Sequence, residues 1–389
     1  MRARYPGYVH TLSARAIAEA VRSGDLSAEE VTRHHLERIA EHDALNALIT
    51  VDSEGALTAA RRRPSGPLAG VPLIVKDLID TAGLRTTYGS PLFAEHVPIA
   101  SASSVSRLLA AGCVLLGKAN LHEFAWGVFS RNRTYGAVGN PARPDRIPGG
   151  SSGGNAAALA AGLCALGLGT DTGGSIRIPS AACGTSGFKP SYGLVPLDGV
   201  WPLAPSSDTV GPMARSIDDC ALALCALTGL PEPEPRLDGL EILHASESDL
   251  PATGELIRFQ IAESAEIHRE LYAAQPEAYD PELRAKLEIA LSVTPAELAR
   301  LRGELEAWRR ECDRALPYDV IVSAVFPGEL PTADQPIAPE TSERLTRFAR
   351  PFNLLGWASA VCRDGTMLSG RDDATVLGAA LAWEQQLES

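Results

Sequence analysis

The first part of the chain carries apolar positions three and four residues apart, the period that predicts amphipathic helices. Ser13 precedes the first apolar segment and Gly24 follows it, and these residue types commonly begin and end helices. Ser27 and Glu30 have the spacing of a capping box, which marks the start of a second helix that runs to about His42. The chain is therefore expected to open with a pair of amphipathic helices.

Farther along, short apolar runs bounded by turn residues alternate with helical patterns. Strands are predicted over residues 45–51, 71–75, 113–116, 165–170 and 319–325. Helices are predicted over residues 104–111, 155–161, 257–272 and 374–387, with a mainly helical stretch over 281–315. The helix over 155–161 consists mostly of alanine, which suits close packing against a sheet. A helix, a glycine and then a buried strand is a recurring order here, and it is typical of an α/β fold.

The composition is that of an ordinary globular protein, since the 389 residues are 45% apolar and 21% charged. The formal net charge of −13 opposes binding to phosphate backbones and anionic lipids, so we expect no direct nucleic-acid partner and no membrane partner. Residues 1–7 lack the apolar run of a leader peptide, and no later stretch reaches the ~18 apolar residues that a spanning helix needs. We therefore expect a cytoplasmic protein.

The seven cysteines are odd in number and lie singly in apolar surroundings. None has the CxxC or His-paired spacing of metal ligands. The pattern predicts buried, reduced thiols and no metal site.

Three polar residues in glycine-rich or strand-end segments are candidates for catalysis, and Lys76 is the first. It follows the apolar run that begins at Val71, so its amine is expected at the end of a buried strand. Burial favours the neutral amine, which can act as a general base. A structural ion pair with the adjacent Asp77 is the alternative.

Ser151 lies in the second candidate motif, Gly149-Gly-Ser-Ser-Gly153. The motif matches the GxSxG nucleophile elbow of α/β-hydrolases, but that elbow needs a strand before the serine, and residues 140–148 contain three prolines. A phosphate-binding loop is a further alternative. The motif lacks the Lys-Ser/Thr pair of a P-loop, and the glycines at 167 and 169 lack the rest of a dinucleotide-binding motif. Neither alternative fits its sequence context.

Ser175 follows the turn Thr172-Gly173-Gly174, which is the third candidate motif. Glycine lets consecutive backbone N–H groups approach one oxygen closely, as an oxyanion hole requires. A serine beside such a turn becomes a nucleophile when a neighbour can take its proton. The pattern indicates an acyl-transfer site, with an ordinary tight turn as the alternative.

Together, the three motifs resemble those of the amidase signature family over residues 71–229. The separations, 75 residues from Lys76 to Ser151 and 24 from Ser151 to Ser175, fit that family's Ser-cisSer-Lys triad. The resemblance implies an α/β amidase signature fold, with a mixed central sheet of about eleven strands surrounded by helices in one domain. It also implies that no metal and no organic cofactor takes part.

The single domain is expected to span residues 1–389 in three parts. These parts are N-terminal helices at 1–44, a signature core at 45–229 and a shortened C-terminal half at 230–389. A Pro-Glu-Pro-Glu-Pro segment predicts an exposed connector between the last two. Compared with the family, the C-terminal half lacks a helix and a strand before His268, and a strand and hairpin are compressed into residues 358–368. The substrate pocket and one sheet edge are affected by this shortening.

The resemblance assigns each motif a role in amide hydrolysis. Ser175 is the acylated nucleophile, Ser151 relays its proton after a cis peptide bond from Gly150, and Lys76 is the base. The remaining assignments concern hydrogen bonding: backbone N–H groups of Thr172, Gly173, Gly174 and Ser175 stabilise the oxyanion, and Ser152, Thr170 and Asp171 are candidate partners behind these groups.

The segment 121–129 lies beside the acyl pocket in this family. Its aromatic residues Phe124, Trp126 and Phe129 are therefore candidates for substrate contact, and packing of an apolar helix face is the alternative. Arg177, two residues after the expected nucleophile, is a further candidate for substrate binding. The expected substrate is a small carboxamide, with esters as a further class.

The resemblance leaves three functions open, and a free-standing amidase is the one that we favour. The second is the glutaminase subunit of a tRNA-dependent amidotransferase, which needs partner chains and an acidic residue before Asn353 to hold the ammonium group of glutamine. Residues 344–350 are basic and only Glu343 is nearby, which counts against this function. The third is a scaffold whose pocket has lost activity. A homodimer is the expected assembly, because it is common among amidases of this family.

Overall fold

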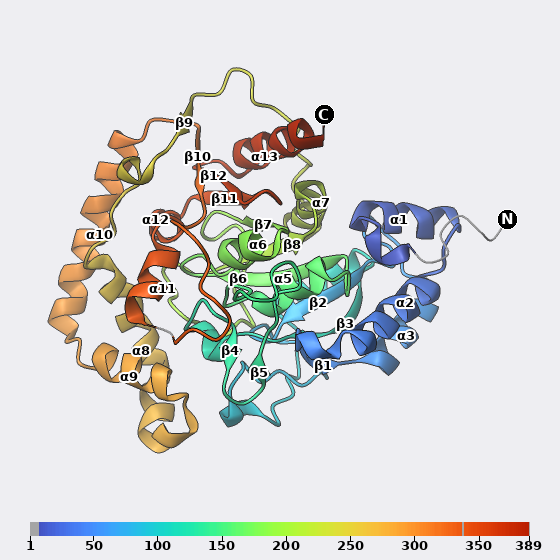
Figure 1. The fold of residues 1–389 in the computed structure, drawn as a ribbon, viewed down its shortest axis with the longest axis horizontal. Coiled ribbons are helices and arrows are strands. Elements are labelled where there is room, and N and C mark those ends of the chain that lie inside the picture. Colours follow the sequence, from blue (N-terminus) through green and yellow to red (C-terminus); the bar gives the residue numbers. More distant parts are fainter. Residues whose placement is uncertain (1–7, 337, 389) are drawn as a thin grey trace.

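A mixed sheet runs through the middle of the molecule with helices on both sides (Figure 1). The computed structural model describes residues 8–336 and 338–388. Residues 1–7, on which the expectation of no leader peptide rested, lie outside the described part of the chain.

The main sheet has ten strands in the described residues, where the sequence resemblance implied about eleven. These strands are β1 (Leu48–Val51), β2 (Pro72–Lys76), β3 (Val114–Ala119), β6 (Leu166–Asp171), β7 (Ser186–Lys189), β8 (Thr209–Ala214), β9 (Ile242–His244), β10 (Val320–Ala324), β11 (Ala358–Val361) and β12 (Thr366–Gly370). Their spatial order is β1-β3-β2-β6-β8-β7-β11-β12-β10-β9. A separate two-stranded ribbon consists of β4 (Arg131–Asn132) and β5 (Gly136–Ala137). Parallel pairs join β2 to β3 and β6, and antiparallel pairs follow from β6 to β10.

Helices cover both faces and one end of this sheet. In chain order they are α1 (Ala14–Ser23), α2 (Ala28–Glu41), α3 (Ser53–Arg61), α4 (Ser103–Ala110), α5 (Gly153–Ala160), α6 (Arg177–Cys183), α7 (Ile217–Thr228), α8 (Leu256–Ala274), α9 (Pro281–Leu291), α10 (Pro295–Ala315), α11 (Pro339–Thr346), α12 (Arg350–Leu355) and α13 (Asp373–Glu388).

The predicted start of the fold is confirmed. Ser13 caps α1 by accepting a hydrogen bond from the backbone of Ala16, and Gly24 ends the helix at a φ of 81°. Ser27 and Glu30 form both hydrogen bonds of the capping box at the start of α2. The local capping signals therefore determined where these helices begin and end.

Strand β2 divides the core into two layers, because successive side chains of a strand point to opposite faces. Leu73 and Val75 pack in one core with α1, α4, α7 and α13. Ile74 packs in a second core with α2, α3 and α5. Lys76 is two residues beyond Ile74, so it belongs to the face of the sheet that α5 covers.

Helix α5 lies very close to the sheet, as its small residues predicted. A Cβ atom at Gly167 would lie 3.1 Å from the amide nitrogen of Asn155, and one at Gly169 would lie 3.1 Å from the hydroxyl of Ser152. Within α5, a Cβ at Gly154 would lie 2.3 Å from the carbonyl oxygen of Asn120. The glycines of β6 therefore allow α5 to lie close to that strand, and Gly154 allows the start of the helix to lie close to the residue that follows β3.

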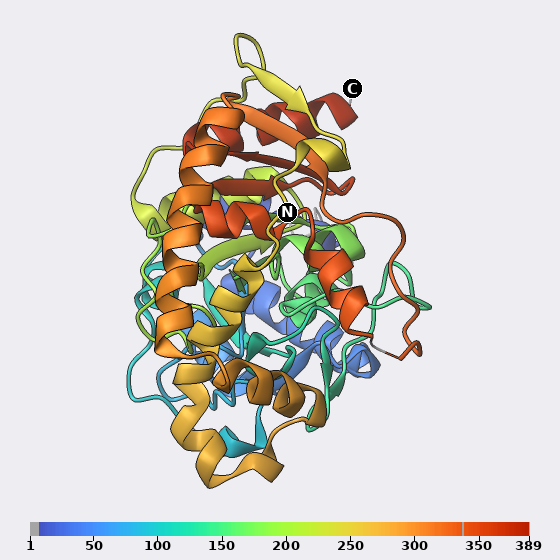
Figure 2. The same cartoon turned by 90° about the vertical axis from the view of Figure 1, so that its left-hand side faces the viewer.

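The C-terminal half extends the sheet and adds a helical layer. The compressed segment 358–368 forms β11 and the start of β12, an antiparallel pair in which Ser359 lies opposite Ser369. Strand β12 pairs with β10, which pairs in parallel with β9. Helix α8 packs against α9 and α10, and these three helices lie together at one side of the molecule (Figures 1 and 2). The shortened segments thus still complete one end of the sheet.

Other features of the described residues agree with a globular interior. All seven cysteines are free; six are buried and Cys225 is half-buried. Within residues 8–336 and 338–388, no helix combines the length and apolarity needed to cross a membrane. The same residues contain no cluster of three or more His, Cys, Asp or Glu side chains arranged to hold a metal ion.

Candidate active site

The amine of Lys76 lies at the carboxyl end of β2 and donates to two hydroxyl groups. Its Nζ is 2.8 Å from Ser151 Oγ and 2.7 Å from Thr170 Oγ1. The side chain is fully buried. This burial lowers the pKa of Lys76 to about 7, although the negative charges of Asp171 and Asp208 act in the opposite direction. A substantial fraction of the amine is therefore neutral near pH 7.

Asp77 does not pair with Lys76. Its carboxylate accepts hydrogen bonds from the backbone and hydroxyl of Thr87 and lies 3.7 Å from the ammonium group of Lys118. Asp77 directly follows Lys76, the last residue of β2, and the alternation of the strand carried one residue further turns the two side chains to opposite faces of the sheet. The structural ion pair that was the alternative for Lys76 is thus formed by a different lysine.

Ser151 lies in a loop before α5, and its peptide bond from Gly150 is cis. The hydroxyl is enclosed, because Ser151 has no exposed surface. Residues 140–148 form loops and turns, so a strand does not lead into this serine as the nucleophile elbow requires. Ser130 supports the loop by donating to the Ser151 carbonyl at 3.4 Å and accepting from the Gly153 N–H at 3.1 Å.

Ser175 lies in the turn between β6 and α6 and is 5% exposed. The backbone N–H of Ser152 donates to the Ser175 carbonyl at 3.2 Å, which holds the two serine-containing segments together. The structure contains no hydrogen bond between the hydroxyls of Ser151 and Ser175, both of which are described. The three predicted catalytic residues are therefore brought to one place, with the Lys76 to Ser151 contact already formed.

A single carboxylate, that of Asp171, organises the turn that carries Ser175. It accepts from the backbone N–H of Gly174 at 2.8 Å and of Ile176 at 3.0 Å. It also pairs with Arg177 at 2.9 Å and accepts from the Asn353 amide at 2.8 Å. Burial alone would raise the pKa of Asp171, but the Arg177 guanidinium outweighs it and holds that pKa well below its usual range. Asp171 is therefore a charged anchor for the turn.

The backbone donors of this turn are not equivalent. The Gly174 N–H is engaged with Asp171, so the expectation that it serves the oxyanion hole is corrected. The N–H groups of Gly173 and Ser175 have no acceptor in the described part of the chain. Gly174 has a φ of 122°, and a Cβ there would lie 2.6 Å from Ile178 Cδ1. The glycine at 174 is required by the shape of the turn.

Of the residues expected behind the site, Thr170 and Ser152 lie close to it. Thr170 contacts Lys76 directly through its hydroxyl, and its carbonyl accepts from the Ser152 hydroxyl at 3.3 Å. Thr172 donates from its hydroxyl to Asp208 at 2.5 Å, and its carbonyl accepts from Gln260 at 2.9 Å. Hydrogen bonds thus fix the end of β6 that leads into the turn.

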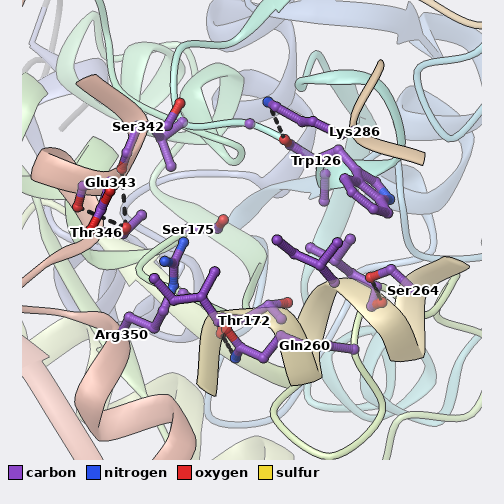
Figure 3. A pocket seen from close by; sticks show the side chains of 18 residues that line it. Trp126, Thr172, Ser175, Gln260, Ser264, Lys286, Ser342, Glu343, Thr346 and Arg350 are labelled. Atoms are coloured by element: carbon purple, nitrogen blue, oxygen red, sulfur yellow. Dashed lines mark hydrogen bonds between the residues drawn. The ribbon is translucent and has the colours of Figure 1, made fainter. Parts of the chain in front are cut away.

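A cavity of about 320 Å³ opens in front of Ser175 (Figure 3). Apolar side chains, among them Val128, Leu203 and Ile257, form much of its wall. Its polar lining includes Gln260 and Ser264 from α8, Lys286 from α9, Ser342, Glu343 and Thr346 from α11, and Arg350 from α12. The volume suits a small-molecule ligand.

Trp126 lines this cavity, as expected from the sequence, but three other predicted substrate contacts do not. Phe124 is buried in an aromatic cluster with Trp201 and His268. Phe129 is buried in a different apolar core. Both are therefore corrected to packing residues, which was the stated alternative.

Arg177 is likewise corrected from a substrate contact to a structural residue. It is fully buried and does not line the cavity. Its guanidinium donates hydrogen bonds to the Asp171 carboxylate, to the side-chain oxygen of Asn353 and, at 2.8 Å, to the carbonyl of Ala349. Arg177 therefore connects the nucleophile turn to α12.

Sequence reasoning missed Arg350, whose guanidinium reaches into the cavity toward Ser175 (Figure 3). Burial lowers the pKa of Arg350 to about 10, while the nearby Glu343 opposes this shift. The residue appeared in the sequence only as part of a basic segment. Its one local signal was its position three residues before Asn353, the residue that Asp171 anchors.

The sequence similarity to known proteins is strongest over the first half of this chain. The family model for amidase matches residues 30–247, more than half of the chain. A glutamyl-tRNA(Gln) amidotransferase subunit of Roseiflexus sp. (strain RS-1) is 45% identical over 229 residues, which are 57% of this chain and 47% of the relative. The subunit of the same name from Roseiflexus castenholzii is 36% identical over 349 residues, 87% of this chain and 66% of the relative. The chain spans about half the length of the curated relatives that it matches, and two thirds of this second one.

The structural comparison extends over almost the whole chain. A crystal structure described as an amidase superposes with a TM-score of 0.88 at 29% identity, covering 96% of this chain and 100% of that one. It confirms the mixed α/β fold that the sequence resemblance implied. The sequence motifs, the fold and the family model agree, and the chain belongs to the amidase signature family.

Proposed function

We propose that this protein hydrolyses a carboxamide through an acyl-enzyme on Ser175, with Ser151 as proton relay and Lys76 as base. The observation that carries the proposal is the 2.8 Å hydrogen bond between Lys76 Nζ and Ser151 Oγ, in a buried setting that lowers the pKa of Lys76 to about 7. A neutral amine beside a serine relay can accept a proton, which a fully charged ammonium group cannot.

The proposed reaction has two stages, the acylation of Ser175 and the hydrolysis of the acyl-enzyme. Ser175 Oγ attacks the amide carbon, its proton passes to Ser151 Oγ, and the proton of Ser151 passes to Lys76 Nζ. The protons return by the same route to the leaving nitrogen, and water then cleaves the acyl ester by the reverse sequence. Hydrogen bonds in a catalytic site commonly tighten only when substrate is bound, so the contact between the two serines is expected to form at that point.

The oxyanion of this reaction has candidate donors in the turn. The N–H groups of Gly173 and Ser175, which have no acceptor among the described residues, support this role, and that of Thr172 stays a prediction. With Gly174 engaged by Asp171, the proposed hole is smaller than the one inferred from sequence. Removing a donor of this kind typically lowers turnover by about 10²- to 10³-fold.

The enclosure of Ser151 favours a small leaving group. Ser175 borders the cavity, whereas Ser151 has no exposed surface and does not border it. The leaving nitrogen must receive its proton from Ser151, so it has to fit into the enclosed side of the site. We therefore propose a primary carboxamide that releases ammonia, with the acyl part of the substrate in the cavity.

A second candidate function is the glutaminase subunit of an amidotransferase. Its support is the 45% identity to a glutamyl-tRNA(Gln) amidotransferase chain and the position of Glu343 on the cavity wall. In the sequence, Glu343 only precedes a basic segment, but in the fold it lines the same cavity as Ser175 and is available to an ammonium group. Both candidates share the release of ammonia from an amide. They differ in whether partner chains receive it.

The test is labelling by a fluorophosphonate probe, followed by ammonia release from a panel of primary amides, esters and glutamine. Labelling of Ser175 that is lost in Lys76→Ala supports the proposed chemistry, and a folded protein that is never labelled supports an inactive scaffold. The mass of the native assembly separates the two candidates, because the glutaminase function requires associated chains of other kinds. A homodimer and a cytoplasmic location stay predictions.

A further inference from the structure

We propose that Arg350 makes the site selective for carboxamides whose acyl group carries a carboxylate, such as the monoamides of short dicarboxylic acids. This inference rests on the proposed function, because that function places the acyl group in the cavity in front of Ser175.

The guanidinium of Arg350 lies beside the turn that carries Ser175. A Cβ atom at Gly173 would lie 3.3 Å from Arg350 Nε and 3.8 Å from one terminal nitrogen, so the guanidinium lies against the backbone of the nucleophile turn. Figure 3 shows the Arg350 side chain pointing into the cavity on the side of Ser175. An anion bound there would lie within a short acyl chain of the reacting carbon.

The guanidinium of Arg350 lacks a close partner among the described residues, although the charge of Glu343 acts on it from a longer distance. Arg350 Nε is buried and has no hydrogen-bond partner, and Arg350 has no ion pair in the described part of the chain. A buried cation without a partner is costly, so an unpartnered group of this kind in a native site calls for an explanation, and a bound anion supplies one. The planar guanidinium binds a carboxylate through two parallel hydrogen bonds, which makes a carboxylate the fitting ligand.

The other cations near the cavity are already paired. Lys286 contacts Glu282 at 2.6 Å and donates to the carbonyl of Trp126. Arg177, on the other side of the turn, is held by Asp171. Arg350 is therefore the cation on this wall that a substrate anion can reach without displacing an existing ion pair of the described residues.

The remaining wall explains the short hydrocarbon spacer. Val128, Leu203 and Ile257 are among the apolar residues that line the cavity. Apolar walls favour methylene groups between the amide and the carboxylate. Glu343 lies at the exposed rim, so it disfavours a second negative charge on the substrate. These charges favour a substrate with a single carboxylate, directed toward the interior of the cavity.

The experiment compares succinamic acid with the uncharged butyramide as substrates. The readout is the ratio of their kcat/KM values, measured by ammonia release from wild type, Arg350→Gln and Arg350→Lys. We expect wild type to prefer the anionic amide, Arg350→Gln to lower the ratio by about 100-fold, and Arg350→Lys to restore part of it. The matched control is Arg347→Gln, because Arg347 is exposed and pairs with Glu247 outside the cavity. That control should leave the ratio unchanged.

A binding measurement separates this inference from the proposed function. Titration calorimetry with succinamic acid, which carries a single carboxylate, on Ser175→Ala and on Ser175→Ala/Arg350→Gln reports the carboxylate site without turnover. Saturable binding that Arg350→Gln weakens supports the site, even if no amide is hydrolysed and Ser175 is not labelled. An unchanged substrate ratio in a folded Arg350→Gln protein, or succinamic acid binding that is absent or independent of Arg350, overturns the inference.

Discussion

Lys76 and Asp77 are adjacent in the chain, yet each is bonded on its own side of the sheet. Lys76 Nζ donates to Ser151 Oγ at 2.8 Å, while Asp77 lies 3.7 Å from Lys118. Because side chains alternate in direction along the chain here, the buried amine of Lys76 is kept away from the Asp77 carboxylate, which would otherwise stabilise its charged form. The amine is left free to exchange its proton with the serine beside it.

Replacing Lys76 with alanine should lower kcat/KM for a primary amide by at least ~10³-fold, because the relay loses its base. The fluorophosphonate labelling rate of Ser175 should fall in parallel. Circular dichroism should show a folded protein, since the variant removes a buried amine whose partners are hydroxyl groups. Near-normal turnover in Lys76→Ala would falsify the assignment of Lys76 as base.

The pH profile should report the same amine. If the neutral form of Lys76 is required, kcat/KM rises about tenfold per pH unit below pH 7 and levels off above it. The profile is measured with a neutral amide, so that the substrate itself does not titrate. A profile that is flat between pH 5.5 and 8.5 contradicts this prediction.

Stability should also increase with pH because of another buried lysine, Lys189. Burial lowers the pKa of Lys189 to about 7, and its amine donates only to the carbonyl of Pro190 among the described groups. The unfolded chain keeps this proton up to about pH 10.4, so it binds more protons than the folded chain above pH 7, and this contribution to the free energy of unfolding increases with pH. Below pH 7 both states are protonated and the contribution is constant.

The measurement is urea denaturation of wild type and Lys189→Met at pH 7.0 and 8.5. We expect the free energy of unfolding to increase less between these two pH values in the variant. Cysteine thiols of the unfolded chain ionise over the same range, but they do so equally in both proteins, so their contribution cancels in the comparison. An equal pH dependence in both proteins contradicts the depressed pKa of Lys189.

Removing the charge of Asp171 should weaken the fold and the site together. In Asp171→Asn, Arg177 keeps no carboxylate partner and the Ser175 turn loses its anionic acceptor. Breaking a buried ion pair from one side typically costs about 3–5 kcal/mol of unfolding free energy. Denaturation should show this loss, and the folded fraction should label more slowly at Ser175. A variant as stable as wild type would show that the pair is not an anchor.

The shape of the nucleophile turn can be tested at Gly174. In Gly174→Ala, the new Cβ would approach Ile178 to 2.6 Å at a φ of 122°. Gly193→Ala is the matched control, because Gly193 also has a positive φ of 84° but nothing within 4 Å of the new Cβ. Both variants carry the backbone cost of roughly 1–2 kcal/mol, and only Gly174→Ala should lose more stability and slow the labelling of Ser175. Equal effects in the two variants contradict a role for close packing at Gly174.

The local parts of the fold could be predicted because their signals are local. Ser13 and Gly24 mark the ends of α1 through hydrogen bonds within a few residues. The positions of Lys76, Ser151 and Ser175 followed from short motifs in register, and the structure brings these residues together. The strand count was less accurate, because the sheet has ten strands in the described residues where about eleven were expected.

The walls of the cavity could not be predicted in the same way. Arg177 and Arg350 are both arginines near the turn, and sequence reasoning chose the one closer in the chain. The structure saturates Arg177 with Asp171 and Asn353 and leaves Arg350 facing the cavity. Which arginine is free depends on contacts between segments more than 170 residues apart, and no short motif encodes them.

The anchoring of Asn353 by Asp171 has an evolutionary consequence. The reacting groups come from residues 76–175, whereas the cavity-lining side chains Gln260, Lys286, Glu343 and Arg350 come from a later region that Asn353 connects to the turn. Substitutions in α8, α9, α11 and α12 can therefore change the cavity wall without altering Lys76, Ser151 or Ser175. New specificities would then arise in one half of the gene, provided that Asn353 keeps its contacts to Asp171 and Arg177.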